Sequence, residues 1–379
     1  MKELKLNKLF EKPISGEWGN EPNQNELGIE VIRTTNFSYD IRLKIGSEIT
    51  YRVIEESKIE SKKLNYGDII IEKSGGSPTQ PVGRVLFYDY TDSVPRICNN
   101  FTAILRPITG NNPKYLAYLL NFLYQQGAVL KHQNKTTGII NLKLNNYLKD
   151  ISVIIPQLET QKNIVDVLDK AQGLIDARKE QIKLMDELIK SAFYEIFGNP
   201  VKNSKEFRQV PLGELCNLKA GKFIKAEDIS DLNENNMYPC FGGNGLRGYV
   251  KEYTHDGYYP LIGRQGALCG NVQFAEGKFY ATEHAIVTQP TVELDIIWLY
   301  IMLREMNLNR LATGAAQPGL NVSTLMPLEV IYPAISLQTE FANKFKEIEI
   351  QKAFMKKSLI DIENNYYGLM QKAFSGKLF

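Results

Sequence analysis

The stretch "IIPQLETQKNIVDVLDK" at residues 154–170 is echoed much later by "IYPAISLQTEFANKFKE" at residues 331–347. Pro156 aligns with Pro333 when the stretches are superposed, and both have a glutamine five residues further on. Other similar segments keep the same order in both halves: "TAILRP" (102–107) and "AIVTQP" (285–290), "YLAYLLNFL" (115–123) and "WLYIMLREM" (298–306), "LIKSAF" (188–193) and "LMQKAF" (369–374). The chain is therefore an internal duplication, whose unit of roughly 180–200 residues is far longer than a solenoid repeat.

Each repeated stretch opens a long proline-free segment whose apolar residues follow the heptad spacing of a coiled coil. The apolar positions of the first segment are Ile164, Leu168, Ala171, Ile175, Ile182, Met185, Ile189, Ala192 and Ile196. Those of the second are Phe341, Phe345, Ile348, Met355, Leu359, Ile362, Tyr366, Leu369 and Ala373. One charged residue interrupts each series, Arg178 in the first and Lys352 in the second.

These two segments are predicted to be long helices that pair with each other. One such helix alone would also fit the core of a large domain, but two in a duplicated chain favour a pair. A pseudo-twofold axis between the halves would run the pair antiparallel. The second series reaches its copy of the repeated phrase four residues later than the first, which predicts a second helix longer by about one turn.

Length and composition are those of an ordinary globular protein of two or three domains. The 379 residues are 43% hydrophobic and 23% charged, and the net charge of +2 neither favours nor excludes a nucleic-acid partner. No apolar run approaches the ~18 residues of a membrane span, and no signal peptide is recognisable, so we expect a cytoplasmic location without a membrane partner. Four widely spaced cysteines without a CxxC pair indicate free thiols.

The segments that precede the two helices do not resemble each other, so a common helical part follows two unlike fronts. The second front contains "YPCFGGNGLRGYV" at 238–250, in which Gly243, Gly245 and Gly248 match the GxGxxG pattern. A dinucleotide site needs a helix after that pattern, whereas the following "YVKEY" is typical of a strand. Glycine-rich turns between short strands explain the pattern better.

Neither front contains a convincing catalytic or metal-binding set. Four side chains of the second front could be drawn as a zinc site: Cys240, His255, Cys269 and His284. No two of them have the short spacing of structural zinc pairs, and no GxSxG elbow is present for nucleophilic catalysis. A weak nuclease-like set remains in Asp256, Glu276 and Lys278. We predict no catalytic residue, no metal site and no cofactor.

What remains is the chemistry of base recognition on loops and strand ends. Arginine can donate two hydrogen bonds to a guanine edge, and asparagine or glutamine can pair with adenine. The candidate DNA-binding residues of the first front are Arg33, Thr35, Asn36, Lys73, Ser77, Gln80 and Arg84. Those of the second front are Asn244, Arg247, Arg264, Gln265 and His284. Any one alone is more often a solvated loop side chain, but as sets they favour a nucleic-acid reader.

The chain resembles the specificity (S) subunits of type I restriction–modification enzymes along nearly its whole length. The resemblance rests on "IIPQLETQKNI" and "IYPAISLQTEF" with the helices that follow, and on "YPCFGGNGLRGYV", "LIGRQGALCGNV" and "FYATEHAIV" in the second front. The family's usual glutamate before the shared glutamine is replaced by Thr160 in the first copy and Leu337 in the second. We therefore assign no contact to Gln161 or Gln338.

The resemblance implies an α+β fold in which two β-rich target-recognition domains are joined by two long antiparallel coiled-coil helices. We place the first DNA target-recognition domain at 1–155, the central spacer helix at 156–198, the second target-recognition domain at 199–331 and the C-terminal spacer helix at 332–379. Such a subunit is not itself an enzyme. Its implied partners are double-stranded DNA, methyltransferase (M) subunits docked on the helices, and restriction (R) subunits. The alternatives are a metal-dependent nuclease acting alone and a standalone tandem nucleic-acid-binding protein.

Overall fold

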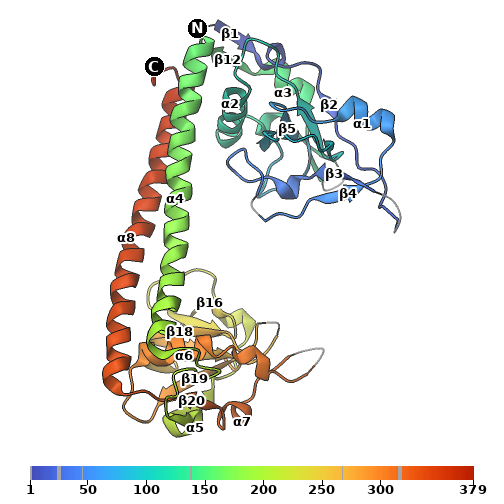
Figure 1. Cartoon of the computed structure of the whole chain (residues 1–379). Helices are drawn as coiled ribbons and strands as arrows, with labels where there is room; N and C mark the ends of the chain where they lie inside the picture. Colours follow the sequence, from blue (N-terminus) through green and yellow to red (C-terminus); the bar gives the residue numbers. More distant parts are fainter. Residues whose placement is uncertain (1, 24–26, 45, 137–138, 267, 315–317) are drawn as a thin grey trace. The chain divides into compact units, whose positions relative to one another are not determined.

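The computed structural model describes the chain apart from residues 1, 24–26, 45, 137–138, 267 and 315–317 (Figure 1). Its contacts form two compact units. Unit 1 comprises Met1–Ala177 and Leu359–Phe379, and unit 2 comprises Arg178–Ser358. Each unit contains one of the unlike fronts together with part of both long helices. The units therefore divide the chain within the helices and not at the ends of the expected recognition domains.

Two long helices, α4 (Leu158–Phe197) and α8 (Ile335–Phe374), occupy the segments with the heptad pattern (Figure 1). In unit 1, the beginning of α4 and the end of α8 share a core that includes Ile164, Leu168, Ile175, Tyr366, Met370 and Ala373. In unit 2, the end of α4 and the beginning of α8 share a core that includes Ile189, Phe193, Phe341 and Phe345. The helices are thus antiparallel, and the predicted α+β class with paired long helices is confirmed.

The expectation that the second helix is longer is wrong, because α4 and α8 each contain 40 residues. The first helix continues for about one turn beyond its copy of the repeated phrase, to Phe197, whereas α8 ends with its copy at Phe374. A glycine in the left-handed region follows each end, Gly198 with φ 69° and Gly376 with φ 71°. Glycine adopts this conformation without a Cβ penalty and commonly terminates helices.

Lys352, the charged residue in the apolar series of α8, lies in the interface between the two helices. Its side chain is buried and donates hydrogen bonds to Asp186 of α4 and, at 3.2 Å, to Glu349 Oε1. Burial lowers the pKa of Lys352, but these hydrogen bonds outweigh it, and the pKa is raised. A buried cation paired across two helices favours one register over its neighbours, because a shifted register would leave the charge unpaired.

Unit 1 is built from small sheets around the helix α2 (Pro113–Gln125). Its largest sheet has the order β2 (Ile14–Ser15), β9 (Thr102–Leu105), β5 (Ile69–Glu72), β7 (Val85–Phe87). A second sheet has the order β4 (Thr50–Arg52), β3 (Ile29–Ile32), β8 (Arg96–Cys98). A third has the order β10 (Gln133–Thr136), β11 (Ile139–Leu142), β6 (Ser74–Gly76), and β1 (Lys2–Lys5) pairs with β12 (Ser152–Ile155). The helices α1 (Glu56–Lys62) and α3 (Leu144–Asp150) lie in the connections.

Unit 2 is organised by one six-stranded sheet beside the helix α6 (Ile296–Glu305). The strand order is β14 (Cys216–Ala220), β19 (Ala285–Pro290), β17 (His255–Gly263), β18 (Val272–Ala281), β15 (Tyr238–Gly242), β16 (Gly245–Val250). A separate pair joins β13 (Gln209–Pro211) to β20 (Glu329–Ile331), with the short helices α5 (Leu212–Leu215) and α7 (Val322–Leu325) nearby in the chain. The GxGxxG residues lie in the β15–β16 hairpin, as the glycine-turn interpretation predicts.

The glutamine shared by the two copies performs the same structural task in each unit. Gln161 is buried; its Oε1 accepts from Asn112 N at 2.8 Å, and its Nε2 donates to Pro156 O at 3.0 Å. Gln338 is buried likewise; its Oε1 accepts from Asp295 N at 2.9 Å, and its Nε2 donates to Pro333 O at 2.9 Å. Asn112 and Asp295 are the N-caps of α2 and α6. The repeated glutamine thus ties the start of each long helix to the start of a short one.

Replacing Gln338 with alanine should destabilise unit 2 by about 1–3 kcal/mol. The N–H of Asp295 and the carbonyl of Pro333 would each lose the hydrogen bond that they make with the Gln338 amide. Thermal unfolding followed by circular dichroism measures the effect. Gln351→Ala is the matched control, since Gln351 is exposed on the same helix. Equal melting temperatures for the two variants would contradict this role of the glutamine.

Candidate nucleic-acid interface

A groove of about 670 Å³ in unit 1 collects several of the polar residues predicted for the first front. We call it the first groove, and it is lined by Thr34, Thr35, Phe37, Ser38, Tyr39, Lys44, Glu72, Gly75, Ser77, Gln80 and Arg84. The turn η2 (Thr34–Asn36) supplies one wall, and the connection from β6 to β7 supplies the other. Four predicted residues meet here: Thr35, Ser77, Gln80 and Arg84.

Arg84 lines the first groove, but its guanidinium is hydrogen-bonded to other residues of the protein. The side chain is buried, with Nε and Nη2 donating to the carboxylate of Glu72 at 3.1 and 3.0 Å and Nη2 donating to Thr34 O at 3.2 Å. Burial lowers the pKa of Arg84, and the hydrogen bond to Glu72 more than offsets this, so the pKa is raised. With its amide turned to satisfy both groups, Gln80 also accepts from Arg84 Nη2 at 2.9 Å. Arg84 therefore holds the groove together through these hydrogen bonds, and its contact with DNA stays a prediction.

Asn36 is also structural. It is buried, its Oδ1 accepts from Arg33 N at 2.8 Å, and its Nδ2 donates to Glu48 O at 3.0 Å. Both ends of the amide are therefore used to fix the turn that carries Thr34 and Thr35, and the DNA contact of Asn36 stays a prediction. Arg33 differs, because its Nε is buried and has no hydrogen-bond partner among the described residues.

The other predicted residues of the first front lie at the groove or near it. Ser77 Oγ accepts from Gln80 N at 3.1 Å and lies 3.1 Å from Thr79 Oγ1, so it shapes its own turn. Lys73 does not line the groove; it donates to Ser15 Oγ, and partial burial lowers its pKa. Thr35 is exposed at the groove. Thr35 is therefore the exposed member of the predicted set that lines the first groove, and all seven residues stay predictions as DNA contacts.

In unit 2 the predicted residues lie on turns that glycines bring into close contact. A Cβ on Gly263 would lie 2.2 Å from Gly243 O, and a Cβ on Gly243 would lie 3.0 Å from His284 O. The β15–β16 turn, which carries Asn244, therefore packs directly on the turns that carry Arg264 and His284. Arg264 N donates to His284 O at 2.9 Å, which joins the last two turns. We call this group the second cluster; its members are Asn244, Arg247, Arg264, Gln265, Glu283 and His284.

The second cluster contains exposed donors beside unpaired buried ones. Arg264 Nη1 donates to Glu283 O at 3.0 Å, whereas Arg264 Nε is buried with no partner among the described residues, as is Glu283 Oε2. The other Glu283 oxygen, Oε1, lies 3.1 Å from His284 Nε2. Asn244, Arg247 and Gln265 are exposed. This arrangement offers fixed donors and acceptors to a polar edge, and Glu283 is a member that the sequence did not single out as a reader.

The nuclease-like set does not assemble into a metal site in this geometry. Asp256 lies opposite Lys278 in the β17–β18 ladder, and Glu276 lies opposite Tyr258. The Lys278 ammonium lies 4.8 Å from the centroid of the Tyr253 ring. Over the described part of the chain, no three His, Cys, Asp or Glu side chains form a group that could hold a metal ion. The four cysteines are buried free thiols, and burial raises the pKa of Cys240 to about 11.

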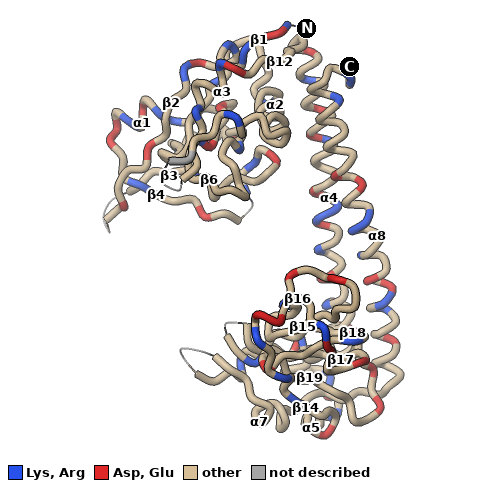
Figure 2. Tube along the Cα trace, turned by 180° about the vertical axis from the view of Figure 1, so that it is seen from behind, with Lys and Arg blue, Asp and Glu red and all other residues tan. Residues whose placement is uncertain are grey.

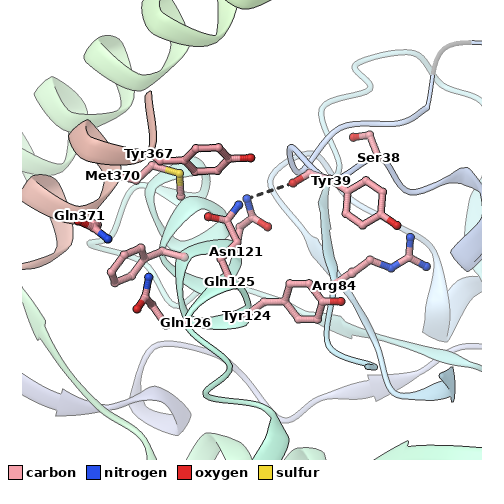
Figure 3. Close-up of a pocket in the computed structure, with 11 residues that line it drawn as sticks. Ser38, Tyr39, Arg84, Asn121, Tyr124, Gln125, Gln126, Tyr367, Met370 and Gln371 are labelled. Atoms are coloured by element: carbon pink, nitrogen blue, oxygen red, sulfur yellow. Dashed lines mark hydrogen bonds between the residues drawn. The ribbon is translucent and has the colours of Figure 1, made fainter. Parts of the chain in front are cut away.

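A second pocket of about 400 Å³ in unit 1 was not predicted (Figure 3). It shares three lining residues with the first groove, Ser38, Tyr39 and Arg84. Its other lining residues come from α2 and the end of α8: Asn121, Phe122, Tyr124, Gln125, Gln126, Tyr367, Met370 and Gln371. Residues more than 200 positions apart in the chain meet here, so no local sequence signal could have found the pocket.

Among the described residues, no helix is both long and apolar enough to cross a membrane. Charged residues of both signs are interspersed along α4 and α8 (Figure 2). The two long helices are therefore polar over much of their surface.

Known proteins resemble this chain in sequence and in fold. It is 44% identical over 190 residues to the type I restriction enzyme EcoprrI specificity subunit of Escherichia coli, an alignment that covers 49% of this chain and 47% of that protein. The chain thus spans about half the length of this relative. A type I restriction–modification S subunit from M. genitalium has a TM-score of 0.55 at 16% identity, covering 98% of this chain and 96% of that one.

A second solved structure, from work on complex assembly and conformational transition of the type I R-M system, has a TM-score of 0.63 at 15% identity. It covers 100% of this chain and 98% of its own. At these identities the two structures establish the fold alone. The family model described as "Type I restriction modification DNA specificity domain" matches residues 1–184 and 204–364. Because these matches take in most of the chain and include both copies of the duplication, the protein belongs to the type I restriction–modification DNA specificity family.

Proposed function

We propose that this chain reads a bipartite site in double-stranded DNA, with each unit contacting one half of the site. The observation that carries the proposal is the presence of two unlike polar surfaces, the first groove and the second cluster, on a duplicated helical framework. A common framework with different reading surfaces is what recognition of two different half-sites requires. The boundaries 1–155 and 199–331 are the proposed target-recognition domains, and 156–198 and 332–379 the proposed spacer helices.

The chain supplies recognition and no catalysis in this proposal. Methylation and cleavage belong to methyltransferase and restriction subunits, which would bring their own methyl donor, ATP and magnesium. The proposed location is the cytoplasm, where such a complex meets DNA. The named relative, a specificity subunit of a type I restriction enzyme, supports this division of labour.

Exposed apolar side chains on the long helices are the proposed docking surface for the methyltransferase subunits. In unit 2 they are Leu184, Leu188, Ile350 and Phe354, and in unit 1 they are Leu174, Ile360 and Tyr367. Leu184 and Leu188 are four residues apart, as are Ile350 and Phe354, and this i, i+4 spacing places the two side chains of each pair on one helix face. Ile350 and Phe354 lie two residues to either side of the seam residue Lys352, so they face away from α4. Large apolar side chains presented this way mark a protein interface.

Phe354→Glu should weaken association with the methyltransferase subunits at least ten-fold, because a charge would replace the ring at the centre of an apolar contact. Co-purification and analytical ultracentrifugation with a type I methyltransferase subunit measure the loss. Lys356→Glu is the matched control, because Lys356 is exposed two residues further along the same helix and does not share the face of Phe354. Equal affinities for the two variants would remove this surface from the proposed interface.

The purified chain should leave DNA uncut and unmethylated in the presence of magnesium, ATP and a methyl donor. The rival nuclease interpretation has a definite test, since it depends on Asp256, Glu276 and Lys278. Incubation of supercoiled plasmid with the chain alone, followed by electrophoresis, gives the answer. Cleavage by the wild-type chain that disappears in Glu276→Ala would replace the specificity-subunit proposal with a nuclease.

A further inference from the structure

The segment Ser38–Arg42 beside the first groove is held in an unusually constrained conformation. Ile41 has φ 64°, although a β-branched side chain is strongly disfavoured in the left-handed region. Its side chain is buried in the core of unit 1, and its carbonyl accepts from Phe87 N at 2.7 Å. A strained residue persists only where its surroundings fix it, so this segment is built into the fold and is not a freely moving loop.

Arg42 fastens the same segment to the long helix α4. Nη1 and Nη2 donate to the two carboxylate oxygens of Asp176 at 2.6 and 2.9 Å, and Nε donates to Asp40 Oδ2 at 2.9 Å. Ser38 Oγ donates back to Arg42 O at 2.6 Å and closes the turn. These groups are partly exposed, and a single exposed ion pair would contribute little. One guanidinium shared by two carboxylates in a bidentate geometry is the arrangement that fixes position.

These contacts fix the backbone that carries Tyr39. Its side chain is 68% exposed, although its backbone carbonyl accepts from Asn121 Nδ2 at 3.4 Å and the segment around it is fixed (Figure 3). The Arg84 guanidinium carbon lies 5.7 Å from the ring centroid. Tyr39 lines both the first groove and the second pocket. An exposed aromatic ring between two hollows, carried on a fixed backbone segment, is suited to contact a ligand, because little backbone entropy remains to be lost on binding.

The chemistry of the second pocket indicates which ligand. Its lining contains amides and tyrosines, which both donate and accept hydrogen bonds, and no carboxylate or lysine. The one charge, on Arg84, is compensated by Glu72. A neutral lining of this kind is not suited to a phosphate or a charged peptide. In a duplex the faces of the bases are stacked on one another, so an aromatic ring can contact a base edge or a thymine methyl group, and amides can pair with the edges.

We propose that Tyr39 contacts a nucleobase of the first half-site with its ring, beside the amide-lined second pocket, and that Arg42 is the residue that positions it. This inference rests on the proposed function of reading double-stranded DNA. It adds a contact residue and a positioning residue to a surface on which Arg84 and Asn36 are already hydrogen-bonded within the protein.

The test begins with selection of duplexes from a randomised library by the wild-type chain, alone or with a type I methyltransferase subunit. Binding of the selected duplex is then compared with duplexes altered in one half. Tyr39→Ala should weaken binding to the intact site about ten-fold, because the contact of the ring with a base edge or thymine methyl group would be lost. Tyr39→Phe should retain most of the affinity. Tyr66→Ala is the matched control, because Tyr66 is 64% exposed in the same unit and lines neither hollow.

Arg42→Lys keeps the charge but loses the bidentate pair, and it should weaken binding several-fold while leaving the melting temperature nearly unchanged. In the Tyr39→Ala background it should have no further effect, because Arg42 acts through Tyr39. An equal effect in both backgrounds would assign Arg42 a general structural role instead.

The failures of the two proposals are distinguishable. If the wild-type chain selects no two-part site, the proposed function itself is wrong. If it selects one, but Tyr39→Ala leaves the first half-site intact or weakens both halves alike, only the assignment of Tyr39 is overturned.

Discussion

Arg264→Ala should reduce discrimination in one half of the recognised site by about 1–3 kcal/mol, or roughly 5- to 150-fold, the value of a bidentate arginine–base contact. Arg264 spends one Nη1 hydrogen bond on Glu283 O, and its Nε is buried without a partner among the described residues. We expect the outer nitrogens of the guanidinium, Nη1 and Nη2, to donate to a base edge. Lysine should not restore the preference, since it lacks the planar pair of donors.

The control for this prediction is Arg310→Ala, which removes an exposed arginine of the same unit that is not part of the second cluster. Binding to the selected duplex and to duplexes altered in either half is measured for both variants. A loss that is uniform over all sequences would make Arg264 a phosphate contact. A loss in both halves would make it a general structural residue.

Gly263→Ala should have a still larger effect on the second half-site. The new Cβ would lie 2.2 Å from Gly243 O, a backbone atom that cannot move aside as a side chain can. The β15–β16 turn would have to leave the Arg264 turn and open the second cluster. We expect destabilisation of about 1–3 kcal/mol or more from overpacking, together with loss of preference in the second half-site.

Gly319→Ala is the matched control, because a Cβ there would have only an ordinary contact, 3.5 Å from Arg264 O. Thermal unfolding and half-site binding are compared for the two alanine variants. Retained second-half preference in a folded Gly263→Ala protein would mean that the contact between these turns is unnecessary for reading.

The long helices could be predicted from the sequence because heptad spacing is a local property. Every residue of both predicted seams is buried or half-buried in the structure. The lengths of the two helices were harder to predict, because α8 ends with its copy of the repeated phrase whereas α4 continues beyond its copy. The repeated glutamine was visible as a pattern, but its task was not, because its partner Asn112 or Asp295 lies more than 40 residues earlier in the chain.

The reading residues were only partly predictable, because a polar side chain on a turn has the same appearance whether it faces a ligand or its own backbone. Asn36 is hydrogen-bonded to the backbone of Arg33 and Glu48, and Arg84 is hydrogen-bonded to the Glu72 carboxylate. Asn36 and Arg84 therefore hold the turns that carry other polar residues. In the second front the glycines were the better guide. They mark the places where three turns approach each other closely enough to gather Arg264 and His284.

The central claim is that the two units read separate halves of one site. Selection of randomised duplexes by the chain, alone or with a type I methyltransferase subunit, followed by sequencing, tests it most directly. We predict two short conserved blocks separated by an unselected gap of fixed length, of which Arg264→Ala degrades one block and leaves the other unchanged. A single continuous block, or equal degradation of both blocks by Arg264→Ala, would contradict the account.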